Sequence, residues 1–226
     1  YNETEYNLEP NVKGSPGGLR DIQMVGWVAK RHFGDESLAD LVQRDFLTDA
    51  EYKTLMEGQT FIWRIRYALH MLTNREEDRI LFDLQTQIAE IFGYQNDKLQ
   101  LAVERLMQDY YRRVFRLREL NDMLLQHFDE AILQENEQDN LVPLNNRFQI
   151  RNNYIETTRE DVFSKTPSAL MEVFVLMAQT PEVTGIRAST IRLIHQHRHL
   201  IDGHFRQDLR NITYFMELLR STPGVS

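Results

Sequence analysis

The chain has 226 residues, of which 42% are hydrophobic and 27% charged, which is enough for a sizeable core in one large domain or two small ones. Because it has no cysteine, it has no disulfide framework, thiolate zinc site or cysteine nucleophile, and we expect a reducing, cytoplasmic location. No apolar run is long enough to cross a bilayer and no signal peptide is recognisable, so we expect no association with a membrane. A formal charge of −8 argues against phosphate-driven binding of nucleic acid. Since the chain begins with Tyr1, we expect a piece of a longer protein.

Helices are predicted throughout the first 134 residues. Apolar residues recur at helical spacing, and Gly34 follows the first run as a stop signal. Thr48 to Glu51 and Thr73 to Glu76 read as capping boxes, each of which opens a helix. From Asp97 to Leu133 no proline or glycine interrupts the spacing, which predicts one helix ~55 Å long. The predicted helices cover about 17–33, 49–72, 78–92 and 97–133.

The second part of the chain, 135–226, is predicted to be more mixed. Residues 135–146 lose all periodicity and read as a polar linker that separates it from 1–134. In "RFQIRNNYIET", Asn152 and Asn153 suit a tight turn, which predicts an isolated β-hairpin. Thr166 and Pro167 open another helix, and two more cover about 188–200 and 205–220. The expected fold is mainly α: a multi-helix bundle with one long central helix and a small β-hairpin.

The stretch "KGSPGGLRDIQ", 13–23, is the first candidate site. Free N–H groups at a helix start, exposed by Gly17 and Gly18 and flanked by Lys13 and Arg20, would bind a phosphate group. It is not a Walker A loop, because the lysine precedes the glycines. The alternative is structural: the glycines permit a tight turn, and Arg20 and Asp21 form salt bridges with neighbours.

Three further clusters are candidates for a site. His195, His197 and His199 lie two residues apart, a spacing that places no two of them well on one helical face, so we expect no metal site there. Arg112, Arg113, Arg116 and Arg118 could form an RNA-facing stripe, but Glu119 and Asp122 can pair with them, which favours a charged outer face. Within "FIWRIRYALH", Trp63, Arg66 and His70 lie near one side of a helix. They could line a polar pocket or tie helices together.

With these segments placed, the chain resembles the bifunctional uridylyltransferase/uridylyl-removing enzymes that modify the nitrogen-regulatory protein PII. The resemblance covers essentially the whole chain. The first motif is the most specific, and a related pattern occurs in the adenylyltransferase of glutamine synthetase, which makes a nucleotidyl-transfer role for the loop the favoured alternative. The motifs are "YNLEPNVKGSPGGLRDIQ", "WRIRYALH", "DRILFDLQ", "LNDMLLQHFDEAIL", "FQIRNNYIE" and "TPSALMEVF".

The resemblance also defines what this chain lacks. No Asp-x-Asp follows Gly14-Ser15, so the Mg²⁺ and triphosphate ligands of the nucleotidyltransferase domain are absent. No His-Asp dipeptide of the HD hydrolase domain occurs either. The resemblance therefore implies the helical region between these two domains, inactive alone and binding no cofactor itself, with Mg²⁺ held elsewhere in the parent enzyme. The implied partners are PII, UTP and the two flanking domains.

The resemblance implies roles for two sets of residues. Lys13, Ser15, Gly17, Gly18 and Arg20 would face the UTP phosphates when this region closes over the nucleotide. A weaker set would line the pocket wall or an interdomain salt-bridge web: Arg64, Arg66, His70, Arg79 and Asp83. Two alternatives remain open, a non-catalytic scaffold that spaces the catalytic domains and docks PII, and a metal hydrolase built on the histidines of 195–199.

Overall fold

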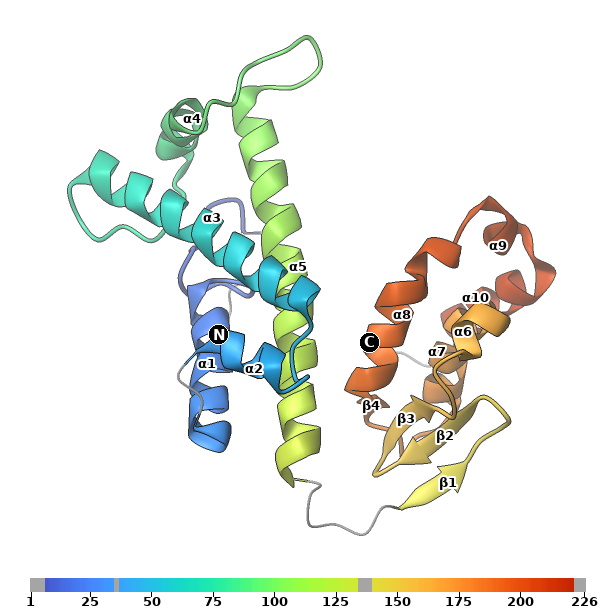
Figure 1. Cartoon of the computed structure of the whole chain (residues 1–226). Coiled ribbons are helices and arrows are strands. Elements are labelled where there is room, and N and C mark those ends of the chain that lie inside the picture. The colour runs from blue at the N-terminus through green and yellow to red at the C-terminus, as the bar shows by residue number, and fades with distance from the viewer. Residues whose placement is uncertain (1–6, 35–36, 134–139, 222–226) are drawn as a thin grey trace. The chain divides into compact units, whose positions relative to one another are not determined.

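The computed structural model describes residues 7–34, 37–133 and 140–221. The chain forms two compact units that divide between Phe128 and Asp129 (Figure 1). The predicted division between 134 and 135 lies at a segment, 134–139, outside the described residues, as does most of the C-terminal "STPGVS". Helices predominate, which confirms the mainly α fold class. None of the helices in the described ranges combines the length and apolar character needed to cross a membrane.

The described part of the first unit consists of helices and connecting segments. The long helix spans 32 residues, about 48 Å at 1.5 Å per residue, and crosses the division between the units. The bounds are α1 Leu19–Phe33, α2 Leu38–Gln43, α3 Asp49–Thr73, α4 Phe82–Ile91 and α5 Ala102–Leu133.

The core of this unit follows the apolar spacing of the sequence. The predicted apolar residues of α3 are all buried, and so are six of the eight predicted along α5. Three residues differ: Trp27 is 66% exposed, because Val25 and Ala29 occupy the inward face of α1, Leu99 is 91% exposed because it precedes α5, and Val103 in the first turn of α5 is only partly buried. The buried residues concerned are Leu55, Phe61, Ile62, Ile65 and Leu69 on α3, and Leu106, Tyr110, Val114, Leu117, Leu124 and Phe128 on α5.

The predicted helix ends agree with the structure at one capping box and differ from it at the other. The capping box at Thr48 is confirmed: the Glu51 N–H donates to Thr48 Oγ1 at 3.2 Å, and the Thr48 N–H donates to Glu51 Oε2 at 2.9 Å. The capping box at Thr73 is wrong. The Thr73 hydroxyl instead donates to the carbonyl of Leu69 at 2.8 Å, and Asn74 ends α3 in the left-handed conformation. Residues 75–81 are therefore not helical, and α4 begins at Phe82.

Helix α5 also begins later than predicted. Asp97 Oδ1 accepts the backbone N–H groups of Leu99 and Gln100, both at 2.8 Å, and Asn96 Oδ1 accepts that of Ala102 at 2.7 Å. These side-chain bonds hold residues 97–101 in a turn, because they use amide groups that a continuing helix would need.

The second unit combines a small sheet with short helices. The strand order is β1-β2-β3-β4, antiparallel except for the parallel pair of β3 and β4. The predicted hairpin is therefore present but not isolated, and residues 141–143 of the predicted linker form its outer neighbour. The bounds are β1 Leu141–Pro143, β2 Phe148–Arg151, β3 Tyr154–Thr157, α6 Val162–Lys165, α7 Ala169–Gln179, β4 Gly185–Ile186, α8 Ala188–His197, the 3₁₀ turn Arg198–Leu200, α9 Gly203–Gln207 and α10 Leu209–Arg220.

The hairpin turn is the one its residues predict. Asn152 and Asn153 have φ of 48° and 68°, both left-handed, as a two-residue type I′ turn requires. The inward residues Phe148, Ile150 and Ile155 pack on α6 and α7 as one core cluster. The predicted helix over 205–220 is two helices, because Asp208 leaves the helical conformation and caps α10 through the Arg210 N–H.

Two glycines provide a matched stability test of the packing in the first unit. A Cβ on Gly58 would lie 2.6 Å from both Cδ atoms of buried Leu117, whereas a Cβ on Gly26 would meet nothing within 4 Å. We expect Gly58→Ala to lower the free energy of unfolding, because overpacking costs about 1–3 kcal/mol. Gly26→Ala should raise it by about 0.5–1 kcal/mol through helix propensity.

Urea unfolding followed by tryptophan fluorescence measures both changes. The two tryptophans of the chain, Trp27 and Trp63, lie in the first unit, so the signal reports on that unit. Equal stabilisation by the two substitutions would contradict the close crossing of α3 and α5.

Candidate functional site

The glycine loop before α1 is closed by its own hydrogen bonds. The Gly17 N–H donates to Asp21 Oδ2 at 2.6 Å, and the Gly18 N–H donates to the Ser15 carbonyl at 2.8 Å. The Asn11 carboxamide oxygen accepts the N–H groups of Lys13 and Gly14 at 3.0 and 2.7 Å. From 11 to 21 every backbone N–H has a partner within the protein, Pro16 having none to donate. The prediction of free amides at Gly17 and Gly18 is therefore wrong.

Gly17 has a packing reason of its own. It has φ +77°, and a Cβ there would lie 2.2 Å from the main-chain oxygen of Val114 on α5. Gly18 is confined by the carbonyls around it, since its Cβ would lie 2.7 Å from the Ser15 oxygen. Both glycines are buried. The glycines permit the tight turn of the structural alternative, and Gly17 in addition lets the loop approach the backbone of α5.

The two cations of the loop remain at its surface. Arg20 is exposed, and the Lys13 side chain is 43% exposed. A Cβ on Gly14 would lie 3.7 Å from Arg20 Nη1, so the Arg20 guanidinium lies beside Gly14, the residue that follows Lys13 in the sequence. Ser15 does not accompany them: it is buried, and its hydroxyl oxygen accepts the Asn11 N–H at 3.0 Å. The loop thus presents two cationic side chains, while each of its backbone N–H groups already has an acceptor within the protein.

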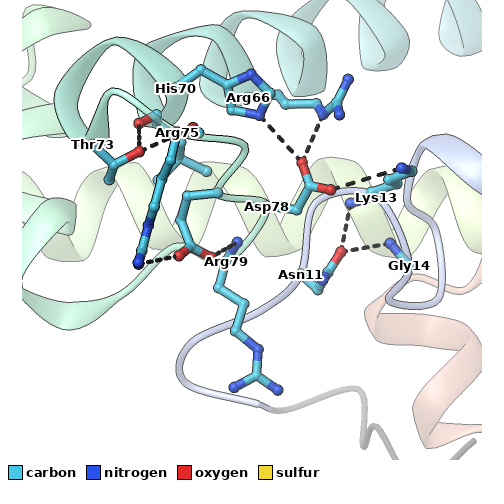
Figure 2. A network of polar contacts seen from close by, with 11 residues as sticks. Asn11, Lys13, Gly14, Arg66, His70, Thr73, Arg75, Asp78 and Arg79 are labelled. Atoms are coloured by element: carbon cyan, nitrogen blue, oxygen red, sulfur yellow. Dashed lines mark hydrogen bonds and ion pairs between the residues drawn. The ribbon is translucent and has the colours of Figure 1, made fainter.

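Asp78 joins this loop to α3 (Figure 2). Its Oδ1 accepts a hydrogen bond from Arg66 Nε at 2.7 Å and lies 3.5 Å from His70 Nε2, while its Oδ2 lies 4.0 Å from Lys13 Nζ. Burial alone would raise the pKa of Asp78, but the Arg66 hydrogen bond and charge, with His70 and Lys13, lower it below its ordinary value. Arg66 also lies over the Trp63 ring, 5.3 Å from its centroid.

The weaker set of predicted residues divides. Arg66 and His70 meet at Asp78, as their one-turn spacing predicted, whereas three others do not join them. Arg64 lies over the Phe92 ring at 4.8 Å. Asp83 is exposed in the first turn of α4, and Figure 2 shows the Arg79 guanidinium pointing away from Asp78.

Two members of the network were missed from the sequence. Asp78 was assigned to a helix, although an acid just before "RILFDL" and near several arginines is a natural partner for them. Asn11 was not singled out, although asparagine side chains commonly accept backbone N–H groups two or three residues further on.

The other candidate clusters form no ligand set. His197 Nδ1 lies 2.8 Å from the Leu193 carbonyl and His199 Nδ1 lies 3.0 Å from the Gln196 carbonyl, so these rings bond to the backbone. Within the described ranges, no three His, Asp or Glu side chains are placed to hold a metal ion together. Arg118 pairs with Asp122, as expected of a charged outer face, whereas Arg113 pairs with the partly buried Asp109 and lies over the Phe61 ring, 4.7 Å from its centroid.

Comparison with known proteins identifies relatives over the whole chain. Residues 1–125 match the family described as GlnD PII-uridylyltransferase, and 148–226 match the uridylyltransferase GlnD third domain. Proteins named bifunctional uridylyltransferase/uridylyl-removing enzyme are 56% identical in Pseudomonas aeruginosa, 55% in Ectopseudomonas mendocina and 54% in Azotobacter vinelandii. Each alignment covers 225 residues, 100% of this chain and 25% of the relative. The chain thus spans about a quarter of the length of these relatives. No solved structure matches it.

The contact of Gly17 with α5 is tested by a pair of left-handed glycines. Gly34 has φ +70° but open space where a Cβ would be, whereas Gly17 meets the Val114 main chain. Alanine at either position costs about 1 kcal/mol for the left-handed conformation. We expect Gly17→Ala to lose about 1–3 kcal/mol more, because backbone atoms cannot rotate out of the way. Equal losses in urea unfolding would contradict the contact.

Asp21 gives a second prediction. Burial raises the pKa of its carboxyl above the ordinary 3.8, the Gly17 N–H lowers it, and Asp122 raises it. Because the folded state then binds the proton more tightly than the unfolded chain, stability falls as the pH rises from about 4 through the raised pKa. In a carboxyl NMR titration, Asp122→Asn should lower the pKa of Asp21 only in part, since burial is the larger cause. A return to 3.8 would contradict this order of causes.

Proposed function

The chain belongs to the GlnD PII-uridylyltransferase family, and we propose that it is the helical segment of a bifunctional enzyme that transfers UMP from UTP to PII and removes it again. The segment would close over the nucleotide held by a transferase domain outside this chain. The observation that supports this role is the pair of surface cations, Lys13 and Arg20, on a loop with a saturated backbone. The proposed location is the cytoplasm, where PII and UTP would be met.

The chemistry of the transfer explains why such a loop would be useful. Moving a phosphoryl-type group needs positioning and charge neutralisation more than covalent help from the protein. Lys13 and Arg20 can supply positive charge to the phosphates of UTP or to the departing pyrophosphate. Because the loop amides are used internally, the loop would contact the phosphates through these two side chains and not through its amides, and Ser15, Gly17 and Gly18 shape the loop that carries them.

Among the residues that the structure describes, no three His, Asp or Glu side chains are grouped to hold Mg²⁺. At the loop, Asp21 accepts the Gly17 N–H, and Asp78 is surrounded by Lys13, Arg66 and His70, whereas Mg²⁺ prefers several oxygen ligands. The proposal therefore leaves the metal to the transferase domain of the longer enzyme. The hydrolytic half of the activity would likewise belong to an HD domain outside this chain.

A scaffold that spaces the catalytic domains and docks PII is the second candidate. One observation favours it: the internal bonds of the loop and the contact of Gly17 with Val114 give the motif a structural reason without any ligand. Titrating the chain with PII and with UTP separately compares the two, because the scaffold predicts binding of PII and no effect of UTP.

The decisive experiment is Lys13→Ala combined with Arg20→Ala in the full-length enzyme. Loss of two phosphate-facing cations should reduce kcat/KM for uridylylation by about 10²-fold. Deuridylylation should stay within about twofold and the melting temperature should be unchanged, because both side chains lie at the surface.

Lys30→Ala combined with Arg31→Ala is the matched control. These residues are two exposed cations in the last turn of α1, the helix that follows the loop, and their loss should leave both activities intact. Equal loss of both activities in the loop variant, together with a lower melting temperature, would mean that the loop is structural.

A further inference from the structure

Asp78 is held in place by its backbone independently of its side chain. The Val12 N–H donates to the Asp78 carbonyl at 2.8 Å, and the Ile80 N–H donates to the Pro10 carbonyl at 3.0 Å, which pairs 78–80 with the segment leading into the loop. Val12 and Ile80 are fully buried beside it. The carboxylate is therefore presented to the loop from a fixed position, and changing it need not detach the segment.

The carboxylate divides its two oxygens between two elements. Oδ1 faces α3, through Arg66 at 2.7 Å and His70 at 3.5 Å, while Oδ2 faces Lys13 of the loop at 4.0 Å. Figure 2 shows Asp78 between them. The Arg66 contact is a short charge-assisted hydrogen bond, whereas the Lys13 contact is a looser ion pair. Asp78 thus orients Arg66 firmly and restrains the more exposed Lys13.

The charges do not cancel. Lys13 and Arg66 carry two permanent positive charges against the one negative charge of Asp78, which leaves one positive charge even when His70 is neutral. Removing the carboxylate would make the patch more positive but less ordered. Attraction of an anion and orientation of the cations therefore respond in opposite directions to the loss of Asp78.

From this geometry we propose that Asp78 is a positioning residue for uridylyl transfer, holding Lys13 and Arg66 in the arrangement that faces the nucleotide phosphates. The role rests on the proposed function. In this role a single carboxylate orients two cationic side chains that come from elements far apart in the sequence. Asp78 itself makes no contact with the nucleotide.

The inference predicts a specific kinetic signature for Asp78→Asn in the full-length enzyme. Because misplaced groups cost transition-state stabilisation, kcat for uridylylation should fall at least about tenfold. The KM for UTP should be unchanged or lower, because a negative charge near the phosphates has been removed. Lys13→Ala should instead raise the KM for UTP. Deuridylylation should be unaffected by Asp78→Asn.

Two further variants keep the test informative should Asp78→Asn fold poorly. Arg66→Lys retains the charge of Arg66 but loses its Nε–H donor to Asp78, so we expect a similar fall in kcat. Asp78→Glu retains the carboxylate and should recover part of the lost kcat. Failure of either expectation would count against the inference.

Asp109→Asn is the matched control. Asp109 is also partly buried and accepts hydrogen bonds from Arg113 Nε at 3.2 Å and Tyr94 at 2.9 Å, so its loss removes a comparable pair within the same unit. It should leave kcat for uridylylation unchanged. Parallel loss of both activities in Asp78→Asn, or a raised KM with normal kcat, would overturn the positioning role.

The outcome also separates this inference from the proposed function. If the Lys13 and Arg20 double variant uridylylates normally, the proposed function fails and Asp78 has nothing to position. If that variant is impaired while Asp78→Asn has a normal kcat, only the role of Asp78 is overturned.

Discussion

The first unit depends on a short antiparallel pairing between 10–12 and 78–80. Asn11 and Arg79 form its bridge, and hydrogen bonds on either side join Val12 to Asp78 and Ile80 to Pro10. These bonds join residues that are 66 and 70 positions apart, so the segment that leads into the loop before α1 is held in place. The same pairing brings a carboxylate from the connection after α3 to a lysine of the loop.

The backbone N–H groups of the loop all have acceptors within the protein, and this changes the interpretation of the glycine motif. A motif with two adjacent glycines beside cations suggests amides offered to an anion, but here each amide already has an acceptor. Gly17 and Gly18 are instead explained by close approach to Val114 and to the loop carbonyls. In the proposed function a charged ligand is then bound by side chains. The orientation of those side chains matters, and this is the role proposed for Asp78.

Local patterns predicted most of the elements, and non-local contacts explain the errors. The apolar spacing of α3, the capping box at Thr48 and the asparagine turn of the hairpin depend on neighbours within a few residues, and these were predicted correctly, as was the spacing of α5 from Leu106 onward. Thr73 has the same local signature as Thr48, yet the segment after it pairs with 10–12 and cannot be helical. Asp78 was missed for the same reason. Arg66 and His70 were found because one turn of helix separates them.

The contact of Gly17 with the main chain of Val114 has a mechanical consequence. Side chains can change rotamer to absorb a small displacement, but backbone against backbone leaves no such freedom. At this point no side chain lies between the loop and α5 to take up a displacement. A shift of the Val114 backbone toward the loop would therefore press directly on the backbone of Gly17.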